Sequence, residues 1–113
     1  MKIELPFKAL SSNNAWQGRR FKSVQYCDFE QDCFKLIKGE QVKGEVEIYY
    51  KFFYKTRQLD IDNPIKPLQD ILVKCKMIED DRKVRKIMVE KFDAEEDRIE
   101  IIIEKYQGLL KSL

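Results

Sequence analysis

The stretch 45–55, EVEIYYKFFYK, constrains the fold more than any other part of the chain, because its side chains alternate in character along its length. Such alternation is typical of a β-strand with one face buried. One face carries only large apolar or aromatic side chains, namely Val46, Ile48, Tyr50, Phe52 and Tyr54. The other carries the charged residues Glu45, Glu47, Lys51 and Lys55. The stretch therefore predicts a strand of a sheet that is covered on one side.

Weaker patterns on either side of this strand predict an α+β fold. We expect one small domain over residues 1–113, with the order β-α-β-α-β-β and helices packed on one face of a mixed β-sheet. The other expected strands are 2–7, 83–91 and 98–106, and the expected helices are 25–38 and the segment that follows Asn63. Either Pro64 or Pro67 marks the first turn of that second helix. We interpret 9–23 as a polar loop and DAEED, 93–97, as a hairpin loop.

The content of cysteine and histidine limits the kinds of catalytic and metal site that the chain could form. The chain has three cysteines and no histidine. A histidine-assisted nucleophile is therefore excluded, and no spacing of zinc ligands is present. The odd number of cysteines predicts free thiols in a reducing cytoplasm. No apolar run approaches the length of a membrane span, so we expect no membrane partner.

The segment 58–70, QLDIDNPIKPLQD, concentrates the residues that could carry chemistry. In an extended chain Asp60 and Asp62 point the same way and lie roughly 6–7 Å apart. Two carboxylates this close are unfavourable unless a cation lies between them, and Mg²⁺ prefers oxygen ligands. The EDD triplet at 79–81 supplies more carboxylates. The alternative is that Asp and Asn only cap a helix and that EDD is an exposed turn.

The N-terminal polar stretch has two interpretations as well. Its hydroxyl, amide and cationic side chains are of the types that bind phosphate oxygens in nucleic acids. These candidates for DNA binding are Ser12, Asn13, Asn14, Arg19, Arg20 and Lys22. The alternative is a solvated loop without a ligand.

The motifs of this chain resemble the RusA family of Holliday junction resolvases over roughly residues 3–105. The pattern D-x-D-N-x-x-K-x-x-x-D is matched by Asp60, Asp62, Asn63, Lys66 and Asp70. An acidic pair after the helix is matched by Asp80 and Asp81. The loop ALSSNN resembles the N-terminal loop of the family, although Ala9 and Leu10 stand where the family has prolines.

The resemblance implies a homodimeric endonuclease that binds branched DNA and nicks four-way junctions in pairs, with Mg²⁺ or Mn²⁺. It implies that Asp60, Asp62 and Asp81 are catalytic metal ligands, with Asp80 as an alternative ligand. It also implies an essential lysine at Lys66, and we expect supporting roles for Asn63 and Asp70. Two other functions stay open: a non-catalytic DNA-binding module of the same fold, and a metal-dependent nuclease that acts on flaps or forks.

Overall fold

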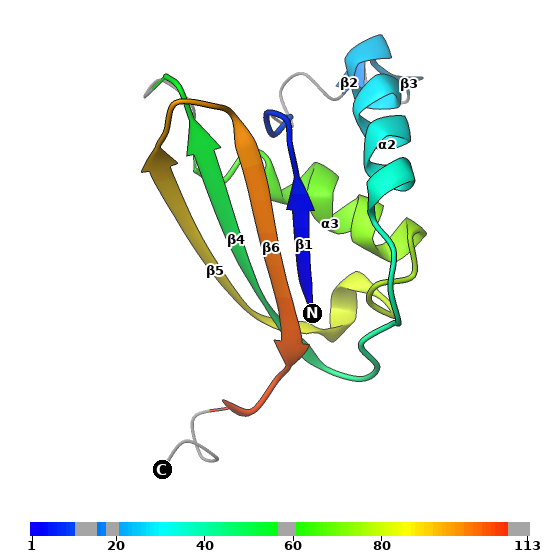
Figure 1. The fold of residues 1–113 in the computed structure, drawn as a ribbon. Coiled ribbons are helices and arrows are strands. Elements are labelled where there is room, and N and C mark those ends of the chain that lie inside the picture. The colour runs from blue at the N-terminus through cyan, green and yellow to red at the C-terminus, as the bar shows by residue number, and fades with distance from the viewer. Residues whose placement is uncertain (11–15, 18–20, 57–60, 109–113) are drawn as a thin grey trace.

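The computed structural model describes residues 1–10, 16–17, 21–56 and 61–108, with the backbone alone at 16, 17, 21 and 22 (Figure 1). The strands are β1 (Lys2–Leu5), β2 (Trp16–Gln17), β3 (Phe21–Lys22), β4 (Val46–Tyr54), β5 (Val84–Asp93) and β6 (Arg98–Lys105). The helices are α2 (Val24–Leu36), α3 (Ile65–Lys74) and the 3₁₀ helix η1 (Asp81–Lys83). The predicted order β-α-β-α-β-β is confirmed for the main elements.

The main sheet has four strands in the order β1-β6-β4-β5. Strand β4 pairs with β5 in parallel and with β6 antiparallel, and β1 pairs with β6 antiparallel, so the sheet is mixed as predicted. A parallel neighbour needs a crossover connection, and α3 lies in the connection between β4 and β5. Figure 1 shows α2 and α3 on the same face of this sheet.

Strand β4 lies inside the sheet, and its alternation is the pattern that the sequence predicts. Every second residue from Val46 to Tyr54 is buried, and the residues between them are half-buried. The buried face joins Leu68, Ile71 and Leu72 of α3 in a single core cluster. Ile99, Ile101 and Ile103 of β6 are fully buried in the same cluster. The core therefore fixes the position of α3 beneath β4.

The interpretation of 93–97 as a hairpin loop is wrong, because β4 lies between β5 and β6. Two strands on either side of a third are about 10 Å apart. The four residues 94–97 that separate the strands span roughly 13 Å when extended. They cross the end of β4, where Ala94 N donates to Tyr54 O at 3.0 Å and Lys55 N donates to Asp97 Oδ1 at 2.9 Å. These bonds fix the crossing.

The interpretation of 9–23 as a loop is also corrected in part. Within it, β2 and β3 form an antiparallel pair, with Trp16 opposite Lys22 and Gln17 opposite Phe21. Two-residue strands are too short for the alternation of side chains to reveal them in a sequence. The pair stands apart from the main sheet and precedes α2, whose first turn is capped by the Ser23 hydroxyl, which accepts from Tyr26 N at 3.0 Å.

Both prolines are compatible with the start of α3. Pro64 is the capping residue, and the first helical bond runs from Leu68 N to Pro64 O at 3.3 Å. The N–H that Pro67 lacks is therefore one of those that have no partner within a helix anyway.

Among the described residues no helix has the length and apolar character that a membrane crossing requires. All three cysteines are free thiols, as predicted.

An ion pair joins α2 and α3, and from it we make a first prediction. Lys74 Nζ of α3 donates to Glu30 Oε2 of α2 at 2.6 Å, and Glu30 is 8% exposed. Because Lys74 is partly exposed, we expect Glu30→Gln to lower the free energy of unfolding by about 1 kcal/mol. Urea unfolding measures this change. An unchanged midpoint would show that the pair does not contribute to the packing of α2 on α3.

Candidate active site

Three charged side chains meet where the first turn of α3 lies beside η1. Lys66 Nζ donates to Asp70 Oδ1 at 3.1 Å, one helical turn further along α3. The same ammonium lies 3.8 Å from Asp81 Oδ2 at the start of η1. The fold thus brings together Lys66 and Asp70 of the first motif and one aspartate of the second. We call Lys66, Asp70 and Asp81 the lysine–carboxylate cluster.

The electrostatics of this cluster favour a permanent positive charge on Lys66. The hydrogen bond to Asp70 and the charge of that carboxylate raise the pKa of the ammonium, partial burial opposes them, and the charge of Asp81 raises it further. Lys66 is therefore protonated at any physiological pH and can act as a cation but not as a base. Its side chain is 65% exposed, so a ligand can reach it.

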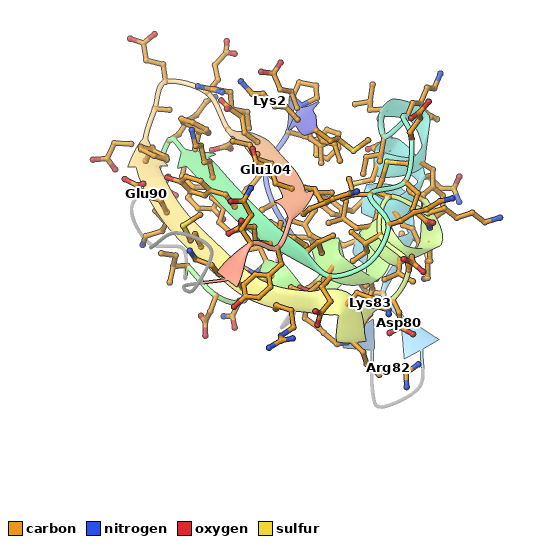
Figure 2. All side chains as sticks on the ribbon, turned by 90° about the horizontal axis from the view of Figure 1, so that it is seen from below. Lys2, Asp80, Arg82, Lys83, Glu90 and Glu104 are labelled. Atoms are coloured by element: carbon orange, nitrogen blue, oxygen red, sulfur yellow. The ribbon has the colours of Figure 1, made fainter. Side chains whose placement is uncertain are left out.

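The two consecutive aspartates after α3 have different surroundings. Asp80 caps η1: its Oδ1 accepts from Arg82 N at 3.0 Å, and its Oδ2 accepts from Arg82 Nη2 at 3.3 Å. The backbone hydrogen bond from Arg82, followed by the guanidinium, lowers the pKa of Asp80. Figure 2 shows Asp80 and Arg82 side by side near the start of β5. Asp81, in contrast, faces Lys66.

The remaining acid of the EDD triplet, Glu79, makes a contact elsewhere. The Glu79 carboxylate accepts a hydrogen bond from the backbone N–H of Gly44, in the segment that leads into β4. Glu79 and Asp80 thus have structural partners of their own. Asp81 is the acid of the triplet that is left for the lysine–carboxylate cluster.

Asp62 and Asn63 form the turn that leads into α3. The Asp62 carbonyl accepts from Ile65 N at 3.1 Å, and the Asp62 side chain is exposed. No hydrogen bond or ion pair of the Asp62 carboxylate occurs within the described part of the chain. Asn63 is half-buried and has a polar contact of its own. The turn therefore supports the start of the helix and still leaves one carboxylate open to a ligand.

Several predicted site residues lie outside the described ranges. These are Asp60 of the first motif and Ser12, Asn13, Asn14, Arg19 and Arg20 of the N-terminal stretch. Lys22 lies in β3, where only the backbone is described.

The donor set of the site fits a hard divalent cation. Asp62 and Asp81 offer exposed or half-exposed carboxylates, which are the ligands that Mg²⁺ prefers. Over residues 1–10, 23–56 and 61–108, no group of three or more Cys, Asp or Glu residues is close enough to hold a metal ion. The described residues by themselves therefore form no complete metal site.

The two acids of the lysine–carboxylate cluster also act on a buried hydroxyl group that the sequence patterns do not single out. Tyr50 of β4 is fully buried, in agreement with its predicted place in the core. Burial raises the pKa of its hydroxyl, and the negative charges of Asp70 and Asp81 raise it further. The sequence signal is weak: a tyrosine stands at a core position where phenylalanine would also fit.

Comparison with known proteins identifies a family that the chain matches. The model of a protein family described as Endodeoxyribonuclease RusA matches residues 11–104, which is most of the chain. The match includes both acidic motifs and the lysine–carboxylate cluster. No curated protein matches the chain.

Proposed function

The chain belongs to the RusA family of endodeoxyribonucleases, and from this premise we propose that it resolves four-way DNA junctions by paired, Mg²⁺-dependent nicks in DNA recombination and repair. The observation that carries the proposal is the contact between Lys66 and Asp81. It joins a cation from one motif to a carboxylate from the other, and both are open to solvent. A phosphodiester hydrolase needs both kinds of group at one place.

In this proposal Asp60, Asp62 and Asp81 hold the metal ion. Bound Mg²⁺ would neutralise phosphate charge and make water a better nucleophile. Mn²⁺ has the same preference for carboxylate oxygens and should replace it. Asp80 is the weaker candidate ligand, because its two oxygens already accept hydrogen bonds from Arg82.

Lys66 supplies the positive charge that the protein itself contributes to the reaction. The negative charge on the phosphate oxygens is redistributed in the transition state, and a fixed ammonium next to them lowers the barrier. Asp70 is proposed as its support, since a carboxylate one turn along the helix holds the ammonium in place. Asn63 is proposed to support the turn that carries Asp62.

The symmetry of the reaction suggests a homodimer. A four-way junction needs two cuts related by symmetry, whereas each chain has one lysine–carboxylate cluster in its described part. Ser12, Asn13, Asn14, Arg19, Arg20 and Lys22 are proposed as contacts to the phosphates of the branched DNA. We place the protein in the cytoplasm, where its free thiols are stable.

Cleavage of a labelled four-way junction tests this function. We expect paired nicks with Mg²⁺ or Mn²⁺, none with EDTA, and slower cleavage of a flap or a linear duplex of the same sequence. Junction affinity should fall steeply with salt, because phosphate contacts release counterions. A junction that is bound but stays intact with either metal ion would overturn the proposal.

Two results would point to the other functions. If calorimetry detects no binding of a divalent cation and the junction stays intact, the chain is a DNA-binding module that retains the fold. If flaps or forks are cleaved faster than junctions, it is a nuclease for other branched DNA.

A further inference from the structure

The main sheet has a second face that neither α2 nor α3 covers. Figure 1 shows both helices on one side of the four strands, and the residues of β4 that alternate with its buried positions lie on the other side. We call this side the open face: it carries Glu47, Tyr49, Lys51 and Phe53 of β4 together with their register partners on β5 and β6. A sheet face that stays in contact with water is expected to be polar.

The open face is not purely polar, because an apolar row crosses its middle. Tyr49 has Met88 of β5 and Ile102 of β6 as register partners, so the three side chains lie next to one another. Met88 is 41% exposed, and all three residues line a hollow of about 200 Å³. Phe53 and Phe92 stack at 4.8 Å further along the same face. Apolar side chains grouped on an exposed surface are typical of a site that binds another protein.

Lys51 lies on the open face beside this row, half-buried, and forms no ion pair with any described residue. Its register partners are Glu90 and Glu100. Glu90 accepts from the Tyr49 hydroxyl at 2.6 Å, and Glu100 is paired with two other cations. The Lys51 ammonium instead lies 5.0 Å from the centre of the Tyr49 ring. A half-buried cation of this kind is expected to have an anion, which a partner molecule could supply.

The charges that flank the apolar row are complementary to one another. Glu47 and Lys86 lie on one side of the row, and Lys51 and Glu90 lie on the other, two residues along the strands in each direction. A twofold axis along the row, between two copies stacked face to face, exchanges these two sides. Glu47 then faces Lys51 of the partner subunit, and Lys86 faces Glu90 of the partner subunit. Each contact occurs twice around the apolar centre.

The same axis brings one pair of like charges together. Glu104 faces Glu100 of the partner subunit, because these residues lie on β6 at the same distance from the row. In its own chain Glu100 pairs with Lys2 at 3.3 Å and with Arg98. Its charge is thus balanced before the partner subunit arrives, and the contact opposes association only weakly.

The open face is also of a suitable size. Strands β4, β5 and β6 have eight to ten residues each. With about 4.8 Å between strands and about 3.3 Å per residue, the face measures roughly 14 by 26 Å in plan. This is roughly half of the ~800 Å² that each partner of a specific interface buries, and side chains that stand up from the plane add to it.

We propose that two copies of this chain pack through their open faces, with the twofold axis along the row of Tyr49, Met88 and Ile102. The inference rests on the proposed function, since it names the interface of the homodimer that paired nicking requires. Because α3 packs on the opposite face of the sheet, the lysine–carboxylate cluster of each copy stays open to DNA and metal. The dimer then carries two clusters related by symmetry.

Exchange of the charges of one contact tests the interface. Lys51→Glu and Glu47→Lys each put two like-charge contacts into a homodimer, so the dissociation constant should rise about a hundredfold or more. In an equal mixture of the two variants, the heterodimer regains both opposite-charge contacts. It should form with an affinity within about threefold of the wild type. Analytical ultracentrifugation and native mass spectrometry of the protein without DNA or metal measure these affinities.

Two further variants control for folding and for charge alone. Lys35→Glu makes the same change at an exposed lysine of α2, which packs on the covered face, and it should dimerise as the wild type does. Lys51→Gln puts no new negative charge between Glu90 and Glu100, and it should weaken the dimer about tenfold. This variant keeps the test decisive if Lys51→Glu does not fold.

The outcomes separate this inference from the proposed function. Charge variants that dimerise like the wild type would overturn the inference, and so would a wild type that is monomeric at about 100 µM. A dimer through the outer edge of β5, where Ile87 is 40% exposed, would give the first of these results. If the wild type nicks junctions in pairs while both charge variants stay dimeric, the function stands and the inference fails. If mixing restores the dimer but the wild type leaves junctions intact, the interface stands and the proposed function fails.

Discussion

Asp81→Asn is expected to reduce junction cleavage about a thousandfold or more, because a catalytic metal ion contributes several kcal/mol and each 1.4 kcal/mol is about tenfold. Asparagine keeps the shape of the side chain and loses the charge that a divalent cation needs. Binding of the junction should persist or tighten, since a negative charge next to the phosphates is removed. Gel shift and cleavage assays on the same junction measure the two effects, and calorimetry should show weaker Mg²⁺ binding.

Asp80→Asn is the matched control for this substitution. The two aspartates are adjacent and similarly exposed, at 43% and 45%, but Asp80 is bound to Arg82 whereas Asp81 faces Lys66. Asparagine is also a good capping residue, so η1 should be preserved. We expect cleavage within about threefold of the wild type. An inactive Asp80→Asn together with an active Asp81→Asn would show that the metal ligand is assigned to the wrong aspartate.

The fold could be predicted from the sequence wherever one face of an element is buried. The alternation of 45–55 predicted β4, and isoleucines at every second position predicted β6, because burial of one face imposes that period. Burial of one face does not determine which strands lie next to each other in the sheet. The alternation in β5 and β6 fits a hairpin equally well. The crossing is shown by the pairing of both strands with β4 and by the bonds of Ala94 and Asp97 at its end.

The candidate site could be predicted in part, for a related reason. Spacing placed Lys66 and Asp70 one turn apart on a helix, and this holds for any helix that includes both. The distance from Lys66 to Asp81 depends on how α3 packs, which the sequence leaves open. The choice between Asp80 and Asp81 depends on which side chain caps η1. A hydroxyl in the core such as that of Tyr50 has no signature in the pattern, because tyrosine and phenylalanine occupy the same positions.

Lys66→Met is expected to lower kcat about 10²–10³-fold, the range seen when one charge-stabilising donor is removed from an active site. Methionine keeps an unbranched stem of similar length and removes the ammonium. KM and junction affinity should change little, because the charge acts mainly in the transition state. Stability should change by about 0.5 kcal/mol at most, since the pair with Asp70 is largely exposed. Single-turnover cleavage and thermal unfolding measure these effects.

Lys74→Met is the control on the same helix, because Lys74 pairs with Glu30 of α2 and has no bond to the lysine–carboxylate cluster. We expect the opposite result: lower stability and unchanged cleavage. Lys66→Arg should retain part of the activity, since it keeps the charge with a different geometry. In the wild type the raised pKa of Lys66 keeps its charge as the pH rises through the neutral range, so loss of this charge lowers cleavage only above that pKa. A Lys66→Met protein that cleaves at the wild-type rate would remove Lys66 from the mechanism and leave the carboxylates alone to account for it.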